Sequence, residues 1–305
     1  MNVEYVAFDS HGVKSMCTRV ETKDAVVTID PGVAYETNSF PLSLEERLRL
    51  VGVFGERIKE SCEKSDTVVV THYHYDHHVP ARDERMFWGK RLLVKNPSEN
   101  VNKSQRVRGR TFLDSIFGLP ERVEFADNKE YTINNTTLSF TEPLWHGSAG
   151  TKLGYILGVN VSDSFDSLFY SSDVSGVLDE KQVEVLLKTK ATTLVIDGPP
   201  TYLLGYVFSR RSLLKSVTNL IKVVNNTSAK TIILDHHLLR DYRYRELLSP
   251  VYERASEVGV TVTTAAESQG FRPSVLECYE RNGPTKWRRW SKLTLGEIEE
   301  SAGED

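Results

Sequence analysis

Short apolar runs separated by turns fill the first third of the chain. Each run is rich in β-branched and aromatic residues, which favour strands. We predict three strands there, over residues 3–8, 15–20 and 25–29. From Ser43 onward the apolar residues recur at helical spacing, and Ser43 and Glu46 match the capping box that begins a helix. A turn at Asp30-Pro31-Gly32 separates this helix from the strands before it.

The remaining sequence alternates further strands with helices. Residues 67–70, with the sequence Thr-Val-Val-Val, predict a short and fully buried strand. Other strands are expected over residues 91–95, 137–141, 153–159, 167–170, 192–196, 231–234 and 260–263. Helices are expected over residues 179–188, 209–224 and 244–258. Strands grouped early and later strands separated by helices predict an α/β domain with helices packed outside layered sheets.

The sequence predicts one domain over residues 1–280 and a polar C-terminal tail over residues 281–305. It contains no internal repeat and no linker rich in Pro, Gly or Ser. Residues 299–305 are expected to be disordered. Within the tail, Lys286-Trp287-Arg288-Arg289-Trp290 mixes cations with aromatic rings. That segment could stack on bases, but we expect it to dock on the domain through its two tryptophans.

Composition is that of a soluble globular protein. Hydrophobic residues make up 39% of the 305 residues and charged residues 26%, and the formal net charge is -4. That near balance gives no global attraction to nucleic acid or to an anionic membrane. The three cysteines stand singly, which argues against a disulfide framework and a thiolate zinc site. Neither a signal peptide nor an apolar stretch of roughly 20 residues is visible, so we expect a cytoplasmic protein without membrane contact.

Metal-competent side chains crowd the end of the predicted strand over residues 67–70. They are His72, His74, Asp76, His77 and His78. Side chains two positions apart on an extended chain point to one side, so His72 and His74 can reach one metal. Asp76 and His77 follow where the chain leaves the strand and can face a second metal. Imidazole and carboxylate suit a hydrolytic zinc, iron or manganese centre, so the sequence predicts a metal site here.

A family resemblance rests on these residues. His72, His74, Asp76 and His77 form an H-x-H-x-D-H string that resembles the signature of the metallo-β-lactamase superfamily. Further elements of that superfamily's pattern follow in order, each after a predicted strand, at Asp30, His146, Asp173 and His236. More narrowly, the sequence is similar to an uncharacterised archaeal family of predicted metal-dependent hydrolases. The resemblance implies a metallo-β-lactamase-like four-layer αβ/βα sandwich.

The resemblance also implies a ligand set for two divalent metal ions, with zinc expected and manganese or iron as alternatives. One ion would be held by His72, His74 and His146, and the other by Asp76, His77 and His236. Asp173 would bridge both ions, and Asp76 and Asp173 would be the catalytic residues. His237 is an alternative to His236, because adjacent residues at a strand end point in different directions; the register favours His236.

Four other residues are expected near this site. Asp30 is a candidate acceptor that fixes the tautomer of a histidine ligand. Asp197 ends a predicted strand and either lines the pocket or caps a turn. His78 is expected to pack or to hydrogen-bond nearby, and His11 to support a ligand or to lie on the surface.

The implied function is hydrolysis of a phosphodiester, lactone or thioester by a metal-bridging hydroxide. An iron-dependent redox enzyme of the same fold is an alternative, and a non-catalytic metal-stabilised binding module is another. We expect a small-molecule or nucleotide-type substrate, and the oligomeric state stays open.

The basic segment 103–110 either contacts phosphates of RNA or forms a solvated loop. Only one strand and one helix are predicted between Asp173 and His236, so the resemblance excludes the nuclease subgroup that carries a long insertion there.

Overall fold

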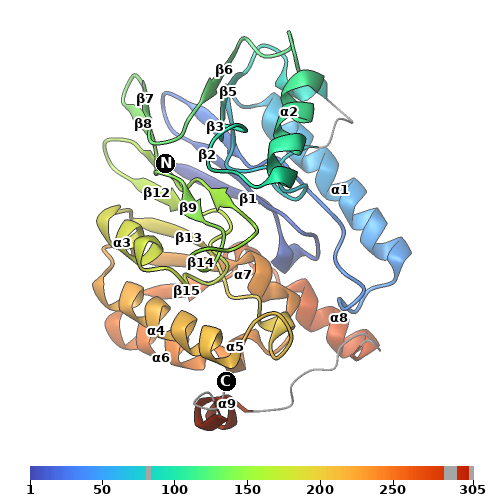
Figure 1. The fold of residues 1–305 in the computed structure, drawn as a ribbon, viewed down its shortest axis with the longest axis vertical. Coiled ribbons are helices and arrows are strands. Elements are labelled where there is room, and N and C mark those ends of the chain that lie inside the picture. Colours follow the sequence, from blue (N-terminus) through green and yellow to red (C-terminus); the bar gives the residue numbers. More distant parts are fainter. Residues whose placement is uncertain (80–83, 285–293, 302–305) are drawn as a thin grey trace.

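The computed structural model describes residues 1–79, 84–284 and 294–301, which form two β-sheets packed between helices (Figure 1). The first sheet has the order β1-β2-β3-β4-β5-β6. Its strands are β1 Asn2–Phe8, β2 Met16–Glu21, β3 Val26–Ile29, β4 Thr67–Val70, β5 Arg91–Val94 and β6 Arg122–Phe125. Strands β1 to β3 are antiparallel neighbours, whereas β3 to β6 run parallel.

The second sheet has the order β15-β14-β13-β12-β11-β8-β7. Its strands are β7 Glu130–Ile133, β8 Thr136–Phe140, β11 Val159–Ser162, β12 Ser167–Tyr170, β13 Thr193–Asp197, β14 Thr231–Asp235 and β15 Thr261–Thr263. Strands β12 to β15 run parallel, and the others pair antiparallel. A separate two-stranded pair consists of β9 Leu144–Trp145 and β10 Tyr155–Ile156.

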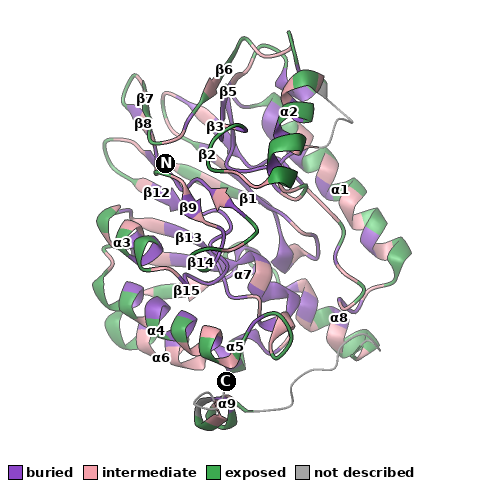
Figure 2. Ribbon diagram, in the orientation of Figure 1, coloured by how far each residue is buried: buried purple, intermediate pink, exposed green. Residues whose placement is uncertain are grey.

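Helices cover the outer faces of the two sheets (Figure 1). The α-helices are α1 Leu44–Glu63, α2 Lys103–Ser115, α3 Glu180–Lys188, α4 Arg210–Asn226, α5 Tyr244–Leu247, α6 Ser249–Val258, α7 Ala265–Ser268, α8 Ser274–Asn282 and α9 Leu295–Ser301. Short 3₁₀ segments are η1 Asp9–His11, η2 Glu84–Phe87, η3 Thr201–Leu203 and η4 His236–Arg240. Figure 2 shows that α1, α2 and α4 each bury one side and expose the other.

The alternation of side chains along the strands produces the layers. In β4, Val68 and Val70 pack with α1 and α2, whereas Val69 points between the sheets. In β13, Val195 also points between the sheets, and the residues on either side of it pack toward α3 and α4. The order of layers is therefore helix, sheet, sheet, helix, which confirms the predicted αβ/βα sandwich.

Three of the predicted elements were wrong. The basic segment 103–110 is not a loop but the first part of α2, which begins after the Asn102 side chain accepts a hydrogen bond from the Gln105 amide at 2.7 Å. The single strand expected over 153–159 is divided between β10 and β11. A Cβ atom at Gly158 would lie 2.7 Å from the Phe169 ring, so the chain passes close to its neighbour between the two strands. The helix expected over 244–258 is two helices, α5 and α6, with Leu248 between them.

The C-terminal region contributes to the core. Helix α8 runs through position 280, and Ile298 of α9 is fully buried among the side chains that pack on the second sheet. The segment Lys286–Trp290 and residues 302–305 lie outside the described residues. Among the helices of the described ranges, none is both long and apolar enough to cross a bilayer.

Candidate metal centre

Most of the predicted ligands come from chain segments that leave the parallel strands at their carboxyl ends, whereas His146 follows β9, which pairs antiparallel with β10. Strand β4 is buried throughout and is followed by His72, whereas β12 leads to Asp173 and β14 leads to His236. The pairing of Asp197 with Asp235 places the ends of β13 and β14 in register. Parallel strands present their carboxyl ends at one edge, so residues far apart in the sequence meet there.

Asp173 is the residue around which this cluster is arranged. Its Oδ2 atom lies 3.5 Å from Nε2 of His72 and 3.1 Å from Nε2 of His146. Its Oδ1 atom lies 2.8 Å from Nε2 of His77 and 3.3 Å from Nε2 of His236. Each carboxylate oxygen therefore faces a different pair of imidazoles, which is the arrangement that a ligand shared by two cations requires.

The ligand atoms fall into groups small enough to hold a cation. One group consists of His72, His74, His146 and Asp173, and a second of Asp76, His77 and His236. Within each group the ligand atoms lie within 4.8 Å of one another. The structure thus brings together all the residues that the sequence resemblance assigned to the two metals.

Two buried polar atoms test whether the cluster fits a metal. Within the described chain, neither Nε2 of His72 nor Oδ1 of Asp173 has a hydrogen-bond partner, although both are buried. Nε2 of His77 lies 2.8 Å from this same Oδ1 atom as a charge contact. Buried polar atoms without partners are costly, and a cation bound between them would remove that cost. The donors are nitrogen and oxygen atoms, which suit zinc, manganese and iron.

Opposite charges in the cluster shift the pKa values of its members. Burial alone would raise the pKa of Asp173, but the imidazoles of His77 and His236 hold it well below its usual range. Burial opposes protonation of His77, yet the Asp173 and Asp30 carboxylates raise its pKa to about 10. Burial lowers the pKa of His74 well below its usual value. The same cluster of carboxylates and imidazoles would favour a bound cation, because metal ligands bind in their deprotonated forms.

Asp30 accepts hydrogen bonds from the start and the end of the segment Thr71–His77. The sequence predicted this residue as an acceptor that fixes the tautomer of a histidine ligand. Its Oδ2 atom lies 2.8 Å from Nδ1 of His77 and accepts hydrogen bonds from Thr71 Oγ1 at 2.6 Å and Tyr170 Oη at 2.9 Å. Its Oδ1 atom accepts the Thr71 amide at 2.7 Å. Nε2 is the nitrogen that His77 presents to Asp173, so Asp30 orients the ring for coordination.

Asp9 and Arg240 are supporting residues that the sequence analysis missed. Oδ2 of Asp9 lies 2.8 Å from Nδ1 of His236, and its Oδ1 accepts Nε of Arg240 at 2.9 Å. Nη2 of Arg240 also lies 3.7 Å from Oδ2 of Asp76. Asp9 is separated from His236 by more than two hundred residues, so no local pattern indicates the contact. The one available signal was the position of Asp9 directly after an apolar strand, like that of Asp30.

The two histidines of the doublet have different surroundings. His236 is fully buried, has a φ angle of 57°, and belongs to the group with Asp76 and His77. His237 directs Nδ1 toward Oδ1 of Asp197 at 2.9 Å, and it also lies near Asp173 and His236. Asp197 both orients His237 and accepts the Ser175 amide at 2.7 Å. The geometry thus favours His236 as the partner of His77, with His237 as an additional imidazole beside the centre.

Strained backbone accompanies the ligands at three strand ends. Asp30, Ser172 and His236 have φ angles of 50°, 56° and 57°, which residues other than glycine rarely adopt. Such conformations cost free energy and concentrate at functional sites, where the surrounding structure maintains them.

The other two histidines do not face Asp173. His78 packs against Tyr73, Tyr75 and Phe112, and its Nδ1 atom lies 2.9 Å from the His74 carbonyl oxygen. His11 stacks on Phe54 and contacts Gln269 at 3.0 Å.

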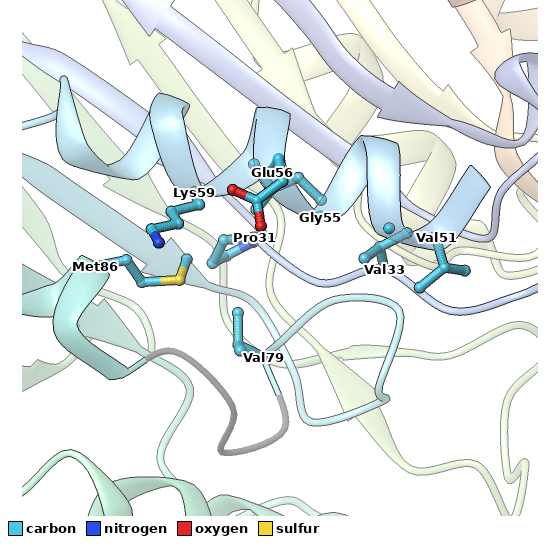
Figure 3. A pocket seen from close by; sticks show the side chains of 10 residues that line it. Pro31, Val33, Val51, Gly55, Glu56, Lys59, Val79 and Met86 are labelled. Atoms are coloured by element: carbon cyan, nitrogen blue, oxygen red, sulfur yellow. The ribbon is translucent and has the colours of Figure 1, made fainter. Parts of the chain in front are cut away.

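A cavity of about 500 Å³ lies between α1 and the segments that carry Pro31 and Val33, Val79, and Met86 (Figure 3). Its lining is mostly apolar and includes Pro31, Val33, Val51 and Val79. Gly32 itself contacts the backbone of His77 and His78: an added Cβ atom would lie 2.4 Å from the His78 nitrogen. Besides its hydrogen bonds to Asp30, the string of metal-competent residues therefore has a tight backbone contact with Gly32, next to open space.

Comparisons with known proteins identify the family and the fold of the chain. No family model matches the chain. A UPF0282 protein of Metallosphaera sedula is 40% identical over 296 residues, covering 94% of this chain and 95% of that protein. Among solved structures, an isothiocyanate hydrolase from Delia radicum gut bacteria aligns with 86% of this chain and 96% of its own, with a TM-score of 0.52 and 15% identity. CmlA, a diiron β-hydroxylase from Streptomyces venezuelae, aligns with 86% of this chain and 52% of its own, with a TM-score of 0.53 and 13% identity.

The two structural likenesses are of low sequence identity, so they establish the fold and leave the activity open. The sequence relative covers nearly the whole of both chains. The chain therefore belongs to the UPF0282 family of archaeal proteins. It also has the αβ/βα sandwich fold that the resemblance of its H-x-H-x-D-H string implied, and shares that fold with the isothiocyanate hydrolase.

Proposed function

We propose that this chain is a dinuclear metal-dependent hydrolase that cleaves an ester-like bond: a phosphodiester, a lactone or a thioester. One observation carries the proposal. The buried Asp173 carboxylate directs one oxygen toward His72 and His146 and the other toward His77 and His236. A carboxylate placed between two sets of imidazoles is what two neighbouring cations need as a shared ligand.

One zinc ion would be held by His72, His74 and His146, and the other by Asp76, His77 and His236, and Asp173 would contribute to both sites. Two such cations would supply a nucleophilic hydroxide at neutral pH and would polarise the oxygen of the bond under attack. Iron and manganese are alternatives because they accept the same donor types.

The protein's own contribution is to hold these side chains in place. Asp30 occupies Nδ1 of His77, and Asp9 occupies Nδ1 of His236, so both rings are left with Nε2 toward Asp173. Burial alone would raise the pKa of the Asp76 carboxyl, but the imidazoles of His77 and His236, and more weakly Arg240 at 3.7 Å, hold it below its usual range. A prearranged set of donors needs little reorganisation when a cation and a substrate bind. The hydrogen bonds from Asp30 and Asp9 to the histidine rings would assist catalysis in this way.

Turnover tests the proposal directly. Purified chain would be loaded with zinc, manganese or iron and assayed with an activated phosphodiester, a lactone and a thioester. We expect metal-dependent hydrolysis of at least one substrate class, and loss of that activity on chelation and in Asp173→Ala. Asp166→Ala is the matched control, because this exposed aspartate precedes β12 whereas Asp173 follows it. Bound metals without turnover in any class would refute the hydrolase assignment.

An iron-dependent redox reaction is the second candidate. The cluster has only nitrogen and oxygen donors, and the fold is shared with CmlA, a diiron β-hydroxylase. Iron as the metal of the protein isolated from its natural source, together with dioxygen consumption by the reduced protein, would favour this candidate. Zinc with hydrolytic turnover would favour the first.

A further inference from the structure

Arg240 joins a second polar cluster to the metal ligands. Its guanidinium donates to both carboxylate oxygens of Asp9, at 2.9 and 3.3 Å, and to Oη of Tyr202 at 3.0 Å. It also lies 3.7 Å from Oδ2 of Asp76 and 3.7 Å from Oε2 of Glu36. Arg240, Asp9 and Glu36 are buried, so this cluster lies inside the protein beside the carboxylate assigned to the second metal.

Glu36 places a carboxyl group in this cluster. Its side chain is fully buried, and within the described chain neither of its oxygens accepts a hydrogen bond. Burial most of all, and then the Asp9 carboxylate, raise the pKa of Glu36 to about 8, against the effect of Arg240. At neutral pH this carboxyl group is therefore mostly protonated and uncharged.

Lys14 is held against the cluster by its backbone. Its amide and carbonyl groups pair with those of Ala34, both at 2.9 Å, two residues before Glu36. The side chain is half-buried, and burial, followed by the charge of Arg240, lowers the pKa of its ammonium group. The carboxyl groups of Glu36 and Asp76 act in the opposite direction. The ammonium group therefore lies among these charges, on the side of the cluster that faces the metal ligands.

The Lys14 ammonium group has no protein partner. No side chain or carbonyl group of the described chain forms a hydrogen bond or an ion pair with it. Lys23, Lys190, Lys215 and Lys230 also lack partners, but they are exposed, so water solvates them. Lys14 differs because its charge is partly withdrawn from water and no protein acceptor compensates for that loss.

The charges of this cluster do not cancel. Burial alone would raise the pKa of Asp9, but Arg240 and His236 hold it below its usual range. The ionised Asp9 offsets the charge of Arg240, and Glu36 at neutral pH adds little negative charge. The carboxylate of the second metal group would be committed to its cation. The positive charge of Lys14 therefore remains beside the metal centre, and a local field of this sign favours an anion.

We propose that Lys14 binds an anionic group of the substrate, a carboxylate or a phosphate, beside the second group of metal ligands. This inference rests on the proposed function and adds a feature to its substrate. Besides the ester-like bond that is cleaved, the molecule carries a second, negatively charged group a short distance away. A lysine ammonium group suits either anion, because it is a compact charge with three donors.

Binding of small dianions tests this inference without any turnover. Zinc-loaded protein would be titrated by calorimetry with malonate, succinate, glutarate and adipate, each compared with its monomethyl ester. One carboxylate can bind the metals, and the second can reach Lys14 when the spacer has a suitable length. Diphosphonates with the same spacers, compared with simple alkylphosphonates, form the phosphate arm of the experiment.

The test variant is Lys14→Met, which removes the charge and keeps an unbranched side chain. Lys14→Arg keeps the charge. The matched control is Lys23→Met, because this exposed lysine follows β2 whereas Lys14 precedes it.

The expected gain is that of a hydrogen bond to a charged group. At least one dianion should bind the wild-type chain roughly 10- to 150-fold more tightly than its monoanionic counterpart. Lys14→Met should lose this gain, whereas Lys23→Met should keep all of it and Lys14→Arg most of it. A larger gain with dicarboxylates would identify the group as a carboxylate, and a larger gain with diphosphonates as a phosphate. A gain that persists in Lys14→Met, or no gain with any dianion, would overturn the inference.

Zinc content and turnover separate this inference from the proposed function. If Lys14→Met bound less zinc than Lys23→Met, Lys14 would support the metal centre itself, and the anion site would be overturned. Metal-dependent hydrolysis by the wild-type chain, without a gain that depends on Lys14, overturns the anion site alone. A gain that depends on Lys14, without hydrolysis of any ester-like substrate, overturns the hydrolase assignment and leaves an anion-binding metal site.

Discussion

Substitution of Gly32 by alanine is the sharpest structural test of how the metal string is held. An alanine Cβ would lie 2.4 Å from the His78 nitrogen, 2.5 Å from the His77 nitrogen and 2.6 Å from the His77 carbonyl carbon. All three atoms are backbone, so no side-chain rotation relieves the contact. The φ angle of Gly32 is not among the positive ones, so the effect of the substitution is steric and not conformational.

The string must therefore move, and the cavity bounded by Pro31, Val33 and Val79 gives it room (Figure 3). Overpacking of this kind costs about 1–3 kcal/mol. Because the displaced residues are ligands, we expect much of that cost to appear in metal binding, as a loss of roughly 5- to 150-fold in affinity. The fold should survive, since the movement is toward open space and away from the sheets.

Metal titration and thermal unfolding would separate these effects. Gly52→Ala on α1 is the matched control, because its added Cβ atom meets nothing within 4 Å. In that exposed helical position alanine is favoured over glycine, so the control should bind metal normally and be slightly more stable. If Gly32→Ala bound metal as tightly as Gly52→Ala, the backbone contact would not position the ligands as described.

Asp30→Asn should weaken metal binding by roughly 10- to 100-fold, measured by competition with a chelator, because an amide orients the ring of its histidine partner less well. His236→Ala should reduce bound metal more than His237→Ala, as metal analysis of both variants would show; equal losses would contradict the assignment. Burial lowers the pKa of His11 to about 4, with Nδ1 accepting the Phe8 amide. As the pH falls, His11 gains a proton near pH 6.5 in the unfolded chain but only near pH 4 in the folded chain. The stabilisation that the neutral ring gives the folded chain is therefore present above a pH of about 6.5 and is lost toward pH 4. The free energy of unfolding can fall by at most about 3 kcal/mol through this effect, because each pH unit between the two pKa values contributes about 1.4 kcal/mol. Denaturant unfolding between about pH 7 and pH 5 should therefore depend less on pH in His11→Gln than in the wild-type chain.

The sequence predicted those parts of the structure that depend on local patterns. The ligands His72, His74, Asp76 and His77 are contiguous and follow an apolar strand, so spacing alone indicated a metal site. The layers were predictable because strands such as β4 and β13 are continuous apolar runs, as parallel strands buried on both faces are.

Helix α2 shows why other parts were missed. Its buried positions are Gln105, Gly109 and Phe112, and two of these three are not hydrophobic. Hydrophobic periodicity was therefore weak, although the spacing is that of a helix face. The helix is held instead by hydrogen bonds of Gln105 and by close packing at Gly109. Both depend on residues distant in the sequence, as does the contact of Asp9 with His236.

The central claim is that the cluster around Asp173 holds two divalent cations, and metal counting tests it most directly. The chain would be reconstituted with zinc, passed through a desalting column and analysed by inductively coupled plasma mass spectrometry beside Asp173→Ala and Asp166→Ala. We predict two zinc ions per chain in the wild type and in Asp166→Ala, and fewer in Asp173→Ala. Retention of two ions by Asp173→Ala would contradict the bridging role, and a wild-type chain that binds none would contradict the metal centre itself.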